Sequence, residues 1–398
     1  MNPAVGEELH SHTEREESPV IYLDNSATTY PKPEAVRRAA PLVLARFGAN
    51  PGRGGYEMSI QTARAVYQTR KIAAELLHAP DAEHVLFTPS CTQAINTVIK
   101  GILQPGDHVV ISCMEHNAVL RPIWEMKKRG VLFTVARVFP GEEERTITAF
   151  RECIKPNTKL IACTHASNVW GVRLPVERLT ALAHENGAWI LVDAAQTAGI
   201  LPIDLTKTPI DFLCCAGHKG LYGPMGTGLM VFGGEARPQP LITGGTGSLS
   251  ASPEQPEMLP DRYESGTGNT PGVILLGQGI RFVQAKGPEK ILRHEMTLIQ
   301  RLYRALEAMP HIRLYTPFPT AKIAVPVLSF NVMDRSSEES AQILAEKGIA
   351  VRAGLHCAPL AHRWAETEPD GAVRVSPSVF TSEQQIDRLI HEIKLLKK

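Results

Sequence analysis

The sequence predicts an α/β protein with a mostly parallel sheet that is covered by helices on both faces. From about residue 60 to 230, short apolar runs alternate with amphipathic stretches. The runs are apolar throughout, which is typical of parallel strands buried on both faces rather than of half-exposed strands. At 398 residues the chain is long enough for a large α/β domain followed by a smaller one.

The predicted elements follow in order along the chain. Apolar runs at residues 84–88, 108–113, 159–164, 189–192 and 212–215 are expected to form strands. Helices are expected at about residues 61–78, 92–103, 119–129 and 177–186, and residues 226–232 add a further strand. The Gly-, Ser- and Pro-rich residues 243–260 then predict a long functional loop.

The remaining residues predict a smaller α+β domain. Two strand-like runs, 324–331 and 372–376, lie among long helical stretches, and Ser382 with Gln385 fits a capping box at the start of the last helix. We therefore divide the chain into a flexible N-terminal extension (1–20), a large cofactor-binding domain (21–274) and a small C-terminal domain (275–398).

The composition argues against several classes of protein. The 42 Lys and Arg nearly equal the 41 Asp and Glu, so no global basic field favours nucleic acid or an acidic membrane. No run of about 18 apolar residues and no secretory signal is visible, so a cytoplasmic protein is expected. The seven cysteines are odd in number and form no C-x-x-C pair, which predicts neither a disulfide framework nor a metal site.

Polar side chains follow four successive predicted strands. They include His116, Asn168, Asp193 and Lys219. Each has a structural explanation when taken alone, as a cap, a structural histidine or a solvated lysine. Because ligands of open α/β sheets bind outside the carboxyl ends of the strands, all four are expected at one rim.

Together these groups match the requirements of pyridoxal phosphate (PLP). Lys219 supplies an amine for the aldehyde, Asp193 a carboxylate for the ring nitrogen, and His116 a flat partner for the ring. Gln196 is placed for the phenolic oxygen. Residues 88–92, including Thr92, lie between a strand and a helix, where backbone N–H groups bind phosphate. No Gly-Lys-Ser/Thr sequence ends the glycine-rich residues 220–228, so a nucleotide P-loop is rejected.

At these residues the chain resembles the cysteine desulfurase and selenocysteine lyase family of the class V aminotransferase superfamily (fold type I PLP enzymes). The resemblance extends from about Tyr22 to the C-terminus. It rests on an ordered set of motifs: residues 22–29 (Tyr-Leu-Asp-Asn-Ser-Ala-Thr-Thr), 115–118 (Glu-His-Asn-Ala), 167–169 (Ser-Asn-Val), 193–196 (Asp-Ala-Ala-Gln), 217–219 (Gly-His-Lys), 266–270 (Gly-Thr-Gly-Asn-Thr), 351–357 (Val-Arg-Ala-Gly-Leu-His-Cys) and Arg374. It implies a mostly parallel seven-stranded sheet and a homodimer with active sites at the subunit interface.

The resemblance also implies roles for further residues. Asn168, Arg352 and Arg374 would bind the substrate, and His218 would contact the phosphate. Thr267 would reach the phosphate of the neighbouring subunit. Cys91 and Thr92 stand where the family has two threonines of a Gly-Thr-Thr phosphate motif. Ala216 stands where the family has Ser or Thr, so one phosphate hydroxyl is missing.

Cys357 decides the subclass. It lies in a short segment next to His356 and five residues after Arg352, and an imidazolium or guanidinium nearby favours the reactive thiolate. A buried, inert cysteine is the alternative, which the polar, glycine-containing surroundings disfavour. The compact segment resembles the group II branch, which includes SUF-system enzymes of iron–sulfur cluster assembly.

The predicted function is that of a cysteine desulfurase, which converts L-cysteine to L-alanine and leaves sulfur on Cys357 as a persulfide. A sulfur-acceptor protein is expected as a partner, and its identity is open. The alternatives are a selenocysteine lyase or another C–S or C–Se lyase, and a PLP-fold binding or regulatory protein without catalysis. A transaminase is disfavoured because it would need no reactive cysteine.

Overall fold

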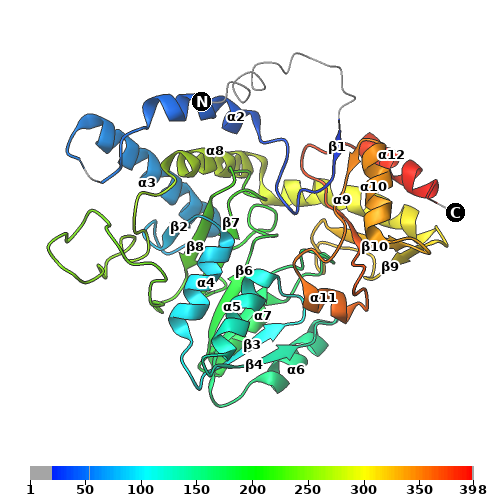
Figure 1. Ribbon diagram of the computed structural model, residues 1–398, viewed down its shortest axis with the longest axis horizontal. Coiled ribbons are helices and arrows are strands. Elements are labelled where there is room, and N and C mark those ends of the chain that lie inside the picture. The colour runs from blue at the N-terminus through cyan, green and yellow to red at the C-terminus, as the bar shows by residue number, and fades with distance from the viewer. Residues whose placement is uncertain (1–19, 53, 397–398) are drawn as a thin grey trace, which may run out of the picture.

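The structure is a computed structural model that describes residues 20–52 and 54–396. A large α/β unit carries a seven-stranded sheet, and a smaller α+β unit lies beside it, at the right of Figure 1. The strands in spatial order are β2 (Val85–Thr88), β8 (Gly228–Phe232), β7 (Phe212–Ala216), β6 (Trp189–Asp193), β5 (Thr158–Thr164), β3 (His108–Ser112) and β4 (Leu132–Ala136). β8 is antiparallel to both neighbours, and the other neighbouring pairs are parallel. The predicted fold class is confirmed.

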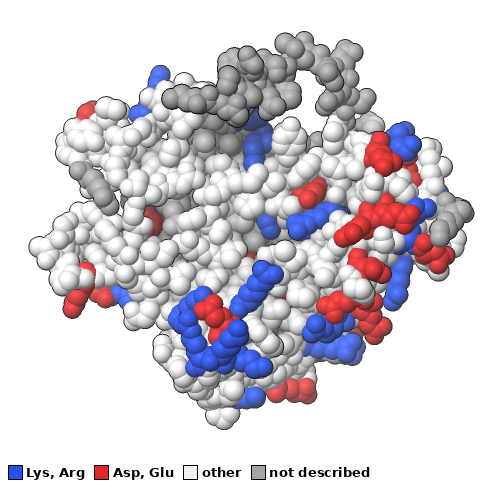
Figure 2. Space-filling model, in the orientation of Figure 1, with Lys and Arg blue, Asp and Glu red and all other residues white. Residues whose placement is uncertain are grey.

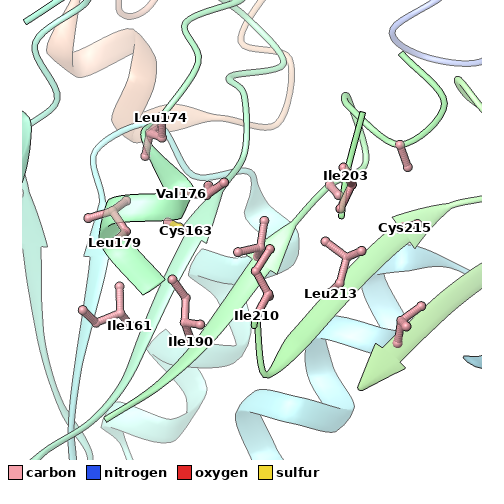
Figure 3. Close-up of a cluster of buried hydrophobic side chains, with 14 of the residues drawn as sticks. Ile161, Cys163, Leu174, Val176, Leu179, Ile190, Ile203, Ile210, Leu213 and Cys215 are labelled. Atoms are coloured by element: carbon pink, nitrogen blue, oxygen red, sulfur yellow. The ribbon is translucent and has the colours of Figure 1, made fainter. Parts of the chain in front are cut away.

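Successive residues of the central strands are buried in two different hydrophobic clusters. Ile161 of β5 and Ile190 of β6 pack on one face of the sheet, under Leu179 of α7 (Figure 3). Leu160 and Leu191, their neighbours in sequence, pack on the other face. Because both faces are covered, the middle positions of β5 and β6 are apolar in an unbroken run, and these strands lack the alternation of a half-exposed sheet.

Helices on both faces supply this cover. They are α2 (Glu34–Arg46), α3 (Glu57–Leu77), α4 (Cys91–Ile102), α5 (Asn117–Lys127), α6 (Glu143–Cys153), α7 (Val176–Glu185) and α8 (Thr270–Lys286). α3, α6 and α7 contribute to one cluster, and α4 and α5 to the other. The segment between β8 and α8, which contains the predicted loop at 243–260, extends away from the sheet at the left of Figure 1.

The smaller unit is built around the antiparallel sheet β12 (Val373–Val375), β10 (Leu328–Val332) and β9 (Ile312–Leu314). Its helices are α9 (Pro288–Glu307), α10 (Ser337–Glu346), α11 (Pro359–Trp364) and α12 (Glu383–Lys394). The predicted capping box at Ser382 and Gln385 starts α12.

The first described strand packs on this smaller unit. β1 (Ile21–Tyr22) pairs in parallel with β11 (Ile349–Ala350), and Leu23 is buried with residues of α9 and α12. The sequence division had placed these residues with the large domain, because a pairing between the two ends of the chain leaves no local signal. The boundary at residue 275 stays a prediction, and the extension 1–20 lies almost entirely outside the described residues.

Three elements of the large unit, α2, β4 and α6, were not predicted. β4 is the edge strand of the sheet, and most of its residues are exposed or half-buried, so it lacks the apolar run that marks the central strands. α6 follows it. Within residues 20–52 and 54–396, no helix is long and apolar enough to cross a membrane.

Candidate active site

The four predicted strand ends meet at one cavity of about 220 Å³. It lies where β3, β5, β6 and β7 end, which is where the alternation of strands and helices predicts a ligand site. The structure brings to its wall all but two of the predicted site residues: Cys91, Thr92, His116, Asn168, Asp193, Gln196, His218, Lys219, Arg352 and Arg374. The exceptions are Cys357 and Thr267.

An anion cradle forms one end of the cavity, at the start of α4. The Ser90 hydroxyl accepts a hydrogen bond from the Gln93 amide at 3.2 Å, and Thr92 in the first turn lines the cavity. Free N–H groups at a helix N-terminus bind phosphate. His218 also reaches this cavity, and its buried Nδ1 has no hydrogen-bond partner among the described residues. Burial lowers the pKa of His218 to about 4, so the ring is a neutral donor or acceptor.

Asp193 provides the buried carboxylate. It is 4% exposed, and its Oδ1 accepts a hydrogen bond from the Ala195 amide at 2.9 Å. The Cys91 thiol lies 3.5 Å from the same oxygen. The sequence places Cys91 in the phosphate motif, and its backbone is there, but its thiol faces Asp193 instead. Burial raises the pKa of Cys91 well above its usual range, so this thiol keeps its proton.

Lys219 lies at the turn after β7. Burial lowers the pKa of its amine, and the negative charge of Asp193 opposes this by raising it. Its amine can therefore be neutral, as covalent binding of an aldehyde requires. The turn is anchored at the carbonyl of His218, which accepts hydrogen bonds from Lys32 Nζ at 2.7 Å and from Thr29 Oγ1 at 3.1 Å. Lys32 was not predicted, because its partner is distant in sequence.

His116 is the N-cap of α5, and its Nδ1 accepts a hydrogen bond from the Ala118 amide at 3.0 Å. Burial lowers the pKa of this histidine, so the neutral ring carries its proton on Nε2. The preceding residue, Glu115, is fully buried, and burial raises its pKa to about 8. Glu115 Oε1 accepts hydrogen bonds from Ser112 Oγ and the Thr164 amide, so it joins the ends of β3 and β5.

Two polar groups at the opposite end of the cavity lack protein partners. Arg374 donates through Nη1 to the Asn168 carbonyl at 2.9 Å and through Nη2 to Asp24, while its buried Nε has no partner among the described residues. The buried Asn168 Oδ1 is also without a described partner, although its Nδ2 donates to the His356 carbonyl at 2.8 Å. Buried polar atoms are rarely left unpaired, so these two indicate a polar ligand. Asp24 was not predicted as a site residue, although it lies in the first motif of the resemblance.

Cys357 is exposed, whereas the other cysteines are buried or half-buried. It lies next to a residue of the cavity wall, His356, and its carbonyl accepts a hydrogen bond from the Asn117 amide at 2.7 Å. The expectation that an imidazolium at His356 favours the thiolate is wrong. Burial lowers the pKa of His356 to about 2, so its ring is neutral. Arg352 lies on the cavity wall.

Two further predicted residues, Gln196 and Thr267, are hydrogen-bonded to other parts of the chain. Gln196 is buried, and its Nε2 donates to the Ser26 carbonyl at 3.1 Å. Thr267 is exposed and lies outside the cavity wall, where its Oγ1 accepts a hydrogen bond from Asn50 Nδ2 at 3.3 Å. Its contact with the phosphate of a neighbouring subunit stays a prediction.

The residues of the cavity fit pyridoxal phosphate. A neutral amine, a buried carboxylate, an imidazole and a helix N-terminus with an unpartnered histidine nitrogen surround one space, in the roles that this cofactor requires. Gly228 permits the cradle to form, because a Cβ there would lie 2.6 Å from the carbonyl carbon of Ser90. Because Gly228 has no side chain, the backbone of β8 can lie directly against the loop that starts α4.

Comparison with known proteins agrees with this geometry. The family described as Aminotransferase class-V matches residues 21–389. A probable cysteine desulfurase of Mycolicibacterium paratuberculosis is 33% identical over 94% of this chain, which spans 55% of that protein. A cysteine desulfurase of Klebsiella pneumoniae is 33% identical over 96% of this chain and 94% of its own length. The apo structure of a cysteine desulfurase from Thermococcus onnurineus NA1 superimposes with a TM-score of 0.86 at 32% identity, covering 95% of this chain and 94% of that one.

Proposed function

The chain belongs to the aminotransferase class-V family, and from this membership and the site we propose that it is a PLP-dependent cysteine desulfurase. It converts L-cysteine to L-alanine and transfers the sulfur to Cys357. One observation carries the assignment: an exposed thiol, Cys357, lies next to a cavity that contains Lys219 and Asp193. A transaminase needs the lysine and the aspartate but no such thiol.

Pyridoxal phosphate, when bound, withdraws electrons from the Cα atom of an amino acid, which weakens the bonds at Cα and Cβ. The protein's part is to hold charges and protons at defined atoms. Asp193 keeps a proton at the ring nitrogen, and its hydrogen bonds from Ala195 and Cys91 fix the carboxylate. The N-terminus of α4 with Thr92 and His218 would hold the phosphate, and His116 would hold the ring.

The substrate is oriented by its carboxylate. Arg374 Nε and Arg352 supply the positive groups, and Asn168 Oδ1 accepts a hydrogen bond. Asp24 and the Asn168 carbonyl hold the Arg374 guanidinium in place. Lys219, whose pKa is lowered by burial, takes the Cα proton as a neutral amine.

Sulfur transfer is completed by Cys357. An electron pair of its thiolate forms the new S–S bond to the substrate sulfur, and the C–S bond of the substrate breaks. The electron pair of that bond stays on the substrate carbon, which takes up a proton and leaves as alanine. Cysteine thiolate is a poor leaving group on its own, so the step requires this nucleophile.

The expected dimer and acceptor fit two exposed surfaces. Several apolar side chains in α2 and at the start of α3 are more than half exposed, among them Leu44, Tyr56 and Met58, and exposed apolar groups of this kind favour a second copy of the chain. α5 begins at the Cys357 turn, and the exposed Lys127 and Lys128 lie at its other end. Figure 2 shows a group of Lys and Arg over α4 and α5, with acidic side chains among them. This favours a sulfur acceptor with an acidic contact surface.

Two finer assignments follow, one from the segment that contains Cys357 and one from the free cysteines of the chain. Only eight residues separate β11 from α11, and this short connection favours the group II branch. The free cysteines suit a reducing compartment, so we place the protein in the cytoplasm.

The function is tested with one equivalent of L-cysteine in the absence of a reductant. Each wild-type subunit is expected to gain about 32 Da, the mass of one sulfur atom, on the peptide that contains Cys357. Cys357→Ala is expected to lose nearly all alanine production while it keeps the absorption of the bound cofactor. Alanine production at the wild-type rate in this variant, or sulfur on Cys91, would contradict the assignment. Cys357→Ala could still release alanine from selenocysteine, and this result would show that the lysis of selenocysteine needs no thiol. The rates on cysteine and selenocysteine must then be compared in the wild type.

A further inference from the structure

Two buried histidines are in contact next to Cys357: His356 belongs to the Cys357 turn, and His362 belongs to α11. The rings of His356 and His362 lie 5.6 Å apart with an interplanar angle of 14°, and His356 Nδ1 is 3.4 Å from His362 Nε2. His362 is fully buried, and its ring packs against Trp170. At the other side, His362 Nδ1 lies 2.8 Å from Thr367 Oγ1. None of these contacts belongs to the cofactor or substrate groups assigned above.

The contacts define where the ring protons lie. Burial lowers the pKa of His356 to about 2 and that of His362 to about 4, so each ring is neutral and has one N–H. His356 Nε2 is 3.4 Å from the Arg352 carbonyl, which can only accept, so the His356 proton belongs on Nε2. His362 Nε2 then donates to His356 Nδ1 at 3.4 Å, and the Thr367 hydroxyl donates to His362 Nδ1 at 2.8 Å in preference to the His362 carbonyl at 3.3 Å. The reverse order would leave a lone pair of His356 facing the Arg352 carbonyl.

The turn above the histidines is strained. His356 has a φ of 49° and Cys357 a φ of 57°, a left-handed conformation that costs free energy for residues other than glycine. The turn therefore persists only because its surroundings hold it. The carbonyls of His356 and Cys357 are held by Asn168 and Asn117, and the His356 ring is held by His362.

We infer that His362 is a positioning residue that acts through His356 to hold the Cys357 turn in the geometry required for sulfur transfer. The inference rests on the proposed function, because it concerns the step in which Cys357 attacks the substrate sulfur. His362 touches neither cofactor nor substrate. Its loss should slow this step and leave the proton transfer at Lys219 intact.

The test separates these two steps. Sulfur transfer is measured as alanine formed in a single turnover of L-cysteine without reductant. Proton transfer at Lys219 is measured as exchange of the Cα hydrogen of L-alanine in heavy water, which needs no thiol. In His362→Phe the ring packing is kept and the N–H is lost, so we expect sulfur transfer to fall by roughly ten- to a hundred-fold and exchange to stay near the wild-type rate.

Two further variants serve as rescue and control. His362→Gln offers an amide N–H near the position of Nε2 and should restore most of the sulfur transfer. His108→Phe removes another buried histidine, one bound to Thr158 and Thr134 at the opposite end of β3. It should lower stability without changing the ratio of the two rates.

A second readout does not depend on activity. The ring ¹⁵N signals of His356 should report a proton on Nε2 in all three proteins, because the Arg352 carbonyl sets it, and the Nδ1 signal should shift only in His362→Phe, where the hydrogen bond to Nδ1 is lost. A proton on Nδ1 in the wild type would overturn the inference. So would equal losses of both rates in His362→Phe, or unchanged sulfur transfer. If the wild type forms no persulfide on Cys357 while Cα exchange is normal, the proposed function fails and the inference fails with it.

Discussion

Gly228→Ala should weaken cofactor binding although residue 228 does not line the cavity. Gly228 is buried in β8, opposite the loop that starts α4. A Cβ atom would lie 2.6 Å from the carbonyl carbon of Ser90 and 2.8 Å from the amide nitrogen of Cys91. Ordinary contact begins at 3.4 Å, so the loop must move by about 0.8 Å (3.4 minus 2.6). Both contacts are backbone atoms, which cannot rotate away.

The displacement falls on the amides that we propose to bind the phosphate. Overpacking of this kind destabilises a protein by about 1–3 kcal/mol, and moving a binding group by about 1 Å can cost about a hundred-fold in function. We therefore expect the Kd for PLP to rise by roughly ten- to a hundred-fold. It is measured by adding PLP to cofactor-free protein and following the absorbance, with urea unfolding of the cofactor-free protein in parallel.

Gly48→Ala is the matched control, because nothing lies within 4 Å of a Cβ at that position. It should bind PLP as the wild type does. If Gly228→Ala loses stability but keeps the wild-type Kd, the loop does not bind the phosphate and the placement of the cradle at residues 90–92 is wrong.

Three further predictions concern single residues of the site. Lys219→Ala should abolish the linkage to the cofactor that borohydride reduces, and a normal reducible adduct in this variant would place the linkage on another lysine. Ala216→Ser should slow the loss of PLP on dialysis, because residue 216 lines the cavity and a hydrogen bond to a charged group contributes about 1.5–3 kcal/mol; faster loss would place residue 216 away from the phosphate. Burial raises the pKa of Glu115 from 4.5 to about 8, so the folded protein holds this proton more tightly than the unfolded chain, and the contribution to stability is lost as pH rises between these values. Glu115→Gln should therefore lose less stability than the wild type between pH 5 and pH 8 in urea unfolding, and an equal loss would show that Glu115 is not the group responsible.

Much of the site could be predicted because each strand end carries its own chemistry. His116, Asp193 and Lys219 follow apolar runs directly, and the order of the elements places strand ends at one rim. The side-chain directions could not be predicted in the same way. The Cys91 thiol turns to Asp193, and the charge of His356 is removed by burial, which depends on residues far away in the sequence.

The sequence by itself determined the α/β fold and the cofactor and brought the main predicted site residues to one cavity, because these depend on local patterns: the period of the apolar residues and the residue types after each strand. Only the tertiary structure decided which groups are charged and which atoms are still unpaired. Asp24 reaches Arg374 from the other end of the chain, and His362 reaches His356 from α11. Burial and hydrogen bonding between different elements of the fold set these properties, and no local pattern records which side chains will meet.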